Sequence, residues 1–90
     1  MVQPRMSGTE IVERGRQLYS ERIRSLVETD ENIGKEVSID VETGDYEIGT
    51  DGISASQALL VRRPEAMIYR KRIGFNAVYS LGGTIRRTSP

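Results

Sequence analysis

Three carboxylates, those of Asp40, Glu42 and Asp45, are close enough in sequence to suggest a cation site or an acid and base pair. They surround Thr43 and Gly44, and aspartate is also favoured in turns because its side chain hydrogen-bonds to nearby backbone. The spacing lacks the alternating ligands and the closing glutamate of a calcium loop. We therefore interpret the three acids as turn residues, and expect no metal ion, no cofactor and no catalytic residue.

The chain of 90 residues contains no histidine and no cysteine. The absence of histidine removes the commonest general base and the commonest neutral metal ligand. The absence of cysteine excludes disulfides and thiolate metal sites, and agrees with a reducing compartment. The composition therefore argues against an enzyme and favours a non-catalytic protein in the cytoplasm.

Charge is balanced over the whole chain but not along it. Thirteen Lys and Arg residues oppose thirteen Asp and Glu residues, so no overall field favours nucleic acid or a membrane. Residues 1–45 hold six Lys or Arg against ten Asp or Glu, whereas residues 46–90 hold seven against three. The two halves could attract each other across a homodimer. No apolar run approaches the roughly 20 residues that span a bilayer, so we expect no membrane contact.

The first element expected is one amphipathic helix over residues 8–28. Ser7 and Glu10 have the spacing of a capping box, which marks the start of a helix. Apolar residues then recur at steps of three and four, and charged residues fill the opposite face. Gly15 on the apolar side predicts a close approach to another element. The stripe that follows consists of Leu18, Tyr19, Ile23, Leu26 and Val27.

Residues 34–49 alternate, break at a turn around Gly44, and alternate again, which predicts a β-hairpin. Val37, Ile39 and Val41 would share one face of the sheet. Ser38 and Asp40 would then lie on a face open to water, as in many antiparallel sheets.

Further elements are expected after the hairpin. Asp51 is the expected N-cap of a second helix, and Pro64 follows its end. The buried side of this helix is expected to consist of Ile53, Ala55, Ala58, Leu59 and Val61. Residues 67–73 and 78–81 are expected to form strands joined by a turn at 74–77. The predicted fold class is α+β in the order α-β-β-α-β-β, with a single domain over residues 7–81. Residues 1–6 and the basic segment 82–90 are expected to be flexible tails.

Helix length suggests a protein-interaction surface. A helix of 21 residues is about 30 Å long, whereas the expected strands span about 20 Å, so part of the apolar stripe should overhang the sheet. A partner protein or a second copy would then cover it, and a sheet edge would add to the site. The expected partner-binding residues are Leu18, Tyr19, Ile23 and Leu26 on the helix, with Tyr69 and Arg72 on the sheet.

The alternative function is nucleic-acid binding through Arg62, Arg63, Arg70 and Arg72. Phosphate binding needs cations gathered on one surface. Alternation places Arg70 and Arg72 on one face of their strand, while Lys71 and the aromatic Tyr69 lie on the other. A platform that combines cations with stacking rings is therefore poorly formed. Exposed cations on an edge strand that discourage aggregation are the competing interpretation.

Two stretches resemble a family of small uncharacterised bacterial proteins, many of them cyanobacterial. They are GKxVxIDxETGDYEI at residues 34–48 and RPxAxxYxxRIG at residues 63–74, and the resemblance covers residues 17–79. It implies a compact α+β domain with no assigned catalytic residues. It also implies an antitoxin-like role or a partnership with a small retropepsin-like aspartic protease. It supplies no functional motif to transfer to individual residues.

Overall fold

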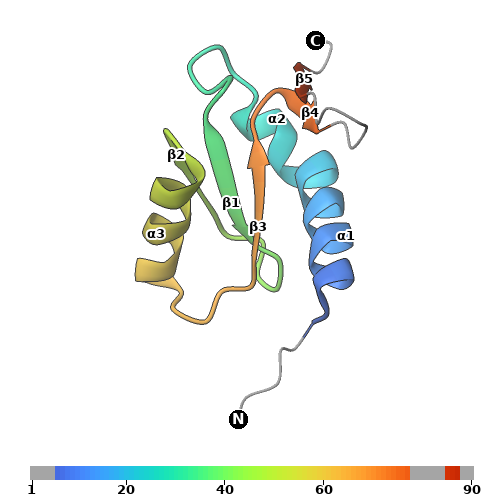
Figure 1. Cartoon of the computed structure of the whole chain (residues 1–90), viewed down its shortest axis with the longest axis vertical. Helices are drawn as coiled ribbons and strands as arrows, with labels where there is room; N and C mark the ends of the chain where they lie inside the picture. Colours follow the sequence, from blue (N-terminus) through green and yellow to red (C-terminus); the bar gives the residue numbers. More distant parts are fainter. Residues whose placement is uncertain (1–5, 78–84, 88–90) are drawn as a thin grey trace.

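The computed structural model describes residues 6–77 and 85–87, and they form an α+β fold (Figure 1). Helical and extended segments alternate much as the sequence predicts. In chain order the elements are α1 (Gly8–Leu18), the π-helical turn η1 (Tyr19–Ile23), α2 (Arg24–Val27), β1 (Glu36–Asp40), β2 (Tyr46–Gly49), α3 (Gly52–Arg62), β3 (Ile68–Arg72), β4 (Phe75–Ala77) and β5 (Ile85–Arg87). The first three follow one another without a break and match the long helix expected over residues 8–28.

The predicted capping box begins α1. The Ser7 hydroxyl accepts a hydrogen bond from the Glu10 amide at 3.1 Å, and the Glu10 carboxylate accepts one from the Ser7 amide at 3.0 Å. These two bonds satisfy donors that the first turn of a helix leaves without partners. They also hold the pKa of the exposed Glu10 carboxyl below its ordinary value, because the charged form is the better acceptor.

The turn η1 changes which side chains of the helix face the sheet. Tyr19, Ile23 and Val27 are spaced by four, and at 3.6 residues per turn each step of four overshoots by about 40°. A wider π turn absorbs this overshoot, so all three side chains stay buried. Leu26 is rotated outward instead, and 63% of it is exposed.

Strand β1 is the centre of a three-stranded antiparallel sheet with the order β2-β1-β3. Val37 lies opposite Ile48 on one side and opposite Lys71 on the other. The hairpin between β1 and β2 turns at Gly44, which has a φ of +85° that glycine adopts at little cost. This is the turn that the sequence predicts.

Helices cover both faces of this sheet, so the expectation of one face open to water was wrong. Val37 and Ile39 pack with the α1 side, in a core that also includes Ile73. The opposite face of β1 carries Ser38 and Asp40, and both are buried. Helix α3 contacts all three strands from that side, and Figure 1 shows it across the sheet from α1 and α2.

Helix α3 begins at the expected N-cap, where the Asp51 carboxylate accepts a hydrogen bond from the Ser54 amide at 2.7 Å. Ala55 and Leu59 are its buried apolar side chains. The placement of Ile53 and Val61 on the buried side was wrong, because they are 65% and 83% exposed. The buried face is narrower than predicted, and small side chains dominate it.

The C-terminal segments also differ from expectation. A turn was expected at 74–77, but the chain turns at Gly74, with a φ of +83°, and β4 begins at Phe75. Strand β5, inside the segment expected to be a tail, pairs antiparallel with β4. The strand expected at 78–81 lies outside the described residues. At the other end, Met6 packs against the core, although it was assigned to a tail.

Candidate interaction surface

The helix stripe expected to bind a partner is mostly part of the protein's own core. Leu18, Tyr19 and Ile23 are each at least 96% buried and belong to one apolar cluster with the sheet. They are therefore not available to a partner, and their assignment as a binding surface was wrong. Leu26 is the residue of that prediction that lies on the surface. The physical reason is that α1 packs along β3, so the sheet covers more of the stripe than strand length suggested.

Tyr69 is held beneath α1 by close contact with Gly15. A Cβ added to Gly15 would lie 2.2 Å from Cγ of the Tyr69 ring, which is far inside normal contact distance. The predicted close approach at this glycine is therefore confirmed. Tyr69 is half-buried and serves first as a packing residue.

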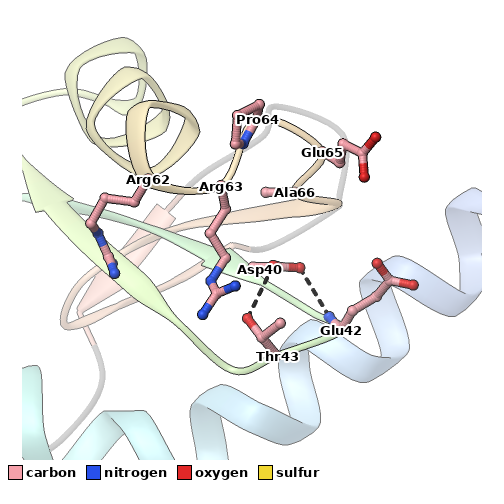
Figure 2. A pocket seen from close by; sticks show the side chains of 8 residues that line it. All are labelled: Asp40, Glu42, Thr43, Arg62, Arg63, Pro64, Glu65 and Ala66. Carbon is pink, nitrogen blue, oxygen red and sulfur yellow. Dashed lines mark hydrogen bonds between the residues drawn. The ribbon is translucent and has the colours of Figure 1, made fainter.

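Arg62 and Arg63 lie at the end of α3, where carboxylates of the hairpin surround them. Arg62 Nε is 2.7 Å from Glu47 Oε2, and Arg62 Nη1 is 3.5 Å from Asp45 Oδ2. Arg63 donates to the same Asp45 carboxylate and holds the pKa of that carboxyl below its usual range. Figure 2 shows both guanidinium groups reaching down from the helix end toward the hairpin.

Arg70 and Arg72 lie toward the other end of α3. The Arg70 guanidinium is so close to Gly52, the first residue of α3, that a Cβ there would lie 1.8 Å from one of its nitrogens. Arg72 pairs with Glu36 at 3.6 Å and donates to the Gly34 carbonyl at 2.9 Å. The four arginines proposed as a nucleic-acid patch thus form two separate groups, and acids or carbonyl oxygens already occupy three of them.

A pocket of about 660 Å³ lies between the hairpin turn and the segment that joins α3 to β3 (Figure 2). Its lining combines opposite charges, from Arg63, Glu42 and Glu65 among others. The buried Asp40 at its base accepts hydrogen bonds from the Glu42 amide at 3.1 Å and the Thr43 hydroxyl at 3.0 Å. Asp40 therefore organises the turn, as the sequence interpretation proposed. Among the described residues, no cluster of His, Cys, Asp or Glu is arranged to hold a metal ion.

Sequence reasoning missed a polar cluster between the helix and β3. The Tyr19 hydroxyl donates to the Glu28 carboxylate at 2.6 Å, and Lys71 Nζ lies 4.9 Å from the centre of the Tyr19 ring. Burial raises the pKa of Tyr19, and the Glu28 carboxylate raises it further. Burial lowers the pKa of Lys71. The sequence feature that could have indicated this cluster is the spacing of nine residues between Tyr19 and Glu28. That spacing is informative only when the helix is known to end at Val27, just before Glu28.

The two edges of the sheet differ in how much backbone they offer. At the two ends of β3, the Met67 carbonyl accepts a hydrogen bond from the Val41 amide and the Ile73 amide donates one to the Lys35 carbonyl, so the peptide groups of the odd-numbered residues of β3 face β1. The peptide groups of Ile68, Arg70 and Arg72 therefore point outward, and no other described strand pairs with them. On β2, Arg62 already donates to the outward carbonyl of Tyr46 at 3.2 Å. The edge of β3 is the more open of the two.

No family model, no curated protein and no solved structure matches this chain. The family resemblance of residues 34–48 and 63–74 therefore stays an expectation. Across the described residues, none of the helices has the length and apolar character to cross a lipid bilayer.

Proposed function

We propose that this chain is a small non-catalytic module that binds another protein along the outer edge of β3. The observation that supports this most directly is a row of outward peptide groups at Ile68, Arg70 and Arg72, unpaired by any described strand. An extended segment of a partner can add to such an edge through main-chain hydrogen bonds. The antitoxin-like role and the protease partnership that the resemblance implies are specific forms of this proposal.

The side chains along this edge suggest the chemistry of the partner. Arg70 and Arg72 are exposed and share the face of β3 that is turned toward α3, while Tyr69 and Lys71 lie on the other face. An added strand would place every second side chain beside the two arginines. A segment with acidic residues at alternate positions would therefore fit best. Tyr69 and Arg72 keep the binding role that the sequence assigned them, now as neighbours of an added strand.

Proline at position 70 gives a direct test. The Arg70 amide points away from β1, so Arg70→Pro removes an outward donor without removing a bond between β1 and β3. Arg70→Thr removes the same charge but keeps the donor and suits a strand. We expect wild type and Arg70→Thr to capture the same protein from the native cell, and Arg70→Pro to lose it.

Hydrogen exchange provides a second readout in case Arg70→Pro folds poorly. The complex should slow exchange of the Arg70 and Arg72 amides, whereas the Tyr69 and Lys71 amides already bond to β1 and should change little. Capture by Arg70→Pro at the wild-type level would refute edge binding. So would a captured partner that leaves exchange at Arg70 and Arg72 unchanged.

The nucleic-acid alternative has its own test. Binding through Arg62, Arg63, Arg70 and Arg72 would weaken steeply as salt is raised, because each phosphate contact releases counterions. The two arginine groups at opposite ends of α3 do not favour it. Retardation of generic DNA or RNA at low salt, lost in Arg70→Thr, would support this alternative over edge binding.

A further inference from the structure

The outer face of α3 is apolar and carries no charge. Ile53, Leu60 and Val61 are 65%, 38% and 83% exposed, and Gln57 lies exposed among them. From Gly52 to Val61 the helix has no charged residue. The outer face of α1 and η1 is quite different, with Glu13, Arg14, Arg16 and Glu21 all exposed. A helix face turned to water normally carries such charges, so the face of α3 suits another protein surface.

Three residues of this face, Ile53, Gln57 and Val61, are arranged symmetrically about Gln57, whereas Leu60 has Ser54 as its counterpart. Ile53 and Val61 each lie four residues from Gln57, so the three form one i, i+4, i+8 ridge along the helix. If a second α3 ran antiparallel across a two-fold axis at Gln57, Ile53 of each copy would meet Val61 of the other. The two Gln57 amides would meet on the axis, where each can donate and accept a hydrogen bond. Self-complementarity of this kind is what a two-fold interface requires.

The helix dipoles favour the antiparallel arrangement. At the C-terminal end of α3, Arg62 and Arg63 already pair with Asp45 and Glu47 of the same chain, so their charges are not counted here. Antiparallel packing opposes the two helix dipoles, whereas parallel packing would align them. The formal net charge of the chain is zero, so no overall repulsion separates two copies.

From this geometry we propose that the outer face of α3 binds a second copy of this chain, with the two helices antiparallel and Gln57 on the two-fold axis. Four side chains make an interface smaller than the standard total of about 1,200–2,000 Å². The dimer should therefore be weak, with a dissociation constant between about 1 μM and 1 mM. This site is separate from the edge of β3, so it does not depend on the proposed function.

Charge exchange at Gln57 tests the axis itself. In Gln57→Lys, two ammonium groups would face each other, and in Gln57→Glu, two carboxylates would. Lysine and glutamate are both good helix formers, so the fold should tolerate either at this exposed site. Analytical ultracentrifugation of the full chain over a dilution series should show wild-type dimerisation. Each variant alone should raise the dissociation constant at least tenfold, and an equimolar mixture should restore it.

The matched controls are Gln17→Lys and Gln17→Glu, which place the same charges on the exposed face of α1. They should dimerise as wild type does. A wild type that stays monomeric up to millimolar concentration would overturn the proposal, as would a dimer that Gln57→Lys leaves unchanged. The proposal would also be overturned if the dissociation constant of the mixture were no lower than that of each variant alone. Binding of a different protein that depends on Gln57, while wild type stays monomeric, would overturn it as well. A monomeric wild type that still binds a partner through β3 would refute the dimer alone.

Discussion

Gly15 is the residue whose substitution best separates local helix preference from packing. Helix propensity alone predicts that Gly15→Ala stabilises α1 by about 1 kcal/mol. The added methyl group would instead meet the Tyr69 ring, 2.2 Å from Cγ. Overpacking of this kind typically costs about 1–3 kcal/mol, so we expect a net loss of stability. Urea denaturation of both proteins would measure it.

Gly8 supplies the matched control for this prediction. It also lies in α1, but a Cβ there meets no atom within 4 Å. Gly8→Ala should therefore leave stability unchanged or raise it slightly. Equal effects of the two substitutions would show that Gly15 is not held against Tyr69.

Tyr19 should make stability depend on pH in the alkaline range. Its pKa is raised above the ordinary value of 10.0, first by burial and then by the hydrogen bond to Glu28. A raised pKa means that the folded protein keeps the proton longer than the unfolded chain does. The resulting stability is fully present below pH 10 and is lost as pH rises beyond it.

Tyr19→Phe measures this effect directly. The stability advantage of wild type over Tyr19→Phe should be constant near neutral pH and shrink above about pH 10. Lys71 titrates nearby with a lowered pKa, which acts in the opposite direction, but both proteins contain it, so the comparison largely removes its effect. An advantage that stays constant into the alkaline range would contradict the role given to the hydroxyl.

Among the elements, the turn η1 decides which side chains of the first helix are buried. We expect Val27→Ala to lower stability by about 2 kcal/mol, because this fully buried side chain would leave a cavity. Leu26→Ala removes a larger side chain yet should cost much less, because Leu26 is mostly exposed. Thermal or urea unfolding of the pair would check the order. The reverse order would mean that the helix continues without the π turn.

Local signals predicted the elements well. The capping box at Ser7, the glycine turn at Gly44 and the N-cap at Asp51 each involve residues a few positions apart, so the sequence contains the whole interaction. Orientation was less predictable, because it depends on what packs from a distance. From the alternation alone, Ser38 is expected on the surface. In the structure α3 covers it, and its hydroxyl hydrogen-bonds to the Ser56 hydroxyl of that helix at 2.8 Å.

The same limit explains the errors in the candidate site. Leu18, Tyr19 and Ile23 form an apolar stripe that suits a partner or a core equally well, and only the extent of the sheet decides between them. For the arginines, the sequence gives charge but not neighbours. The carboxylates of Asp45 and Glu47 reach Arg62 only because α3 ends beside the hairpin.

For the whole molecule, the unequal charge of the two halves of the sequence is partly balanced by ion pairs within one chain. Arg62 and Arg63 pair with Asp45, and Arg72 pairs with Glu36, so each pair joins the basic half to the acidic half. These side chains are 20–46% exposed, and such pairs contribute little net stability.

We therefore expect added salt to lower the unfolding free energy by less than Val27→Ala does. Urea denaturation at low and high sodium chloride would measure the change, with Arg72→Gln as a variant that has lost one pair. A larger fall in wild type would show that charge pairing between the halves helps to hold the fold together.

The central place of β1 has a consequence during protein synthesis. The ribosome completes β1 and its hairpin partner β2 well before it reaches β3, which starts at Ile68. Until then, one side of the middle strand has no neighbour, and the nascent chain exposes a template on which another polypeptide can lay down a strand. Chaperone binding to the nascent chain should therefore be greatest after β1 has left the ribosome and before β3 has emerged to pair with it.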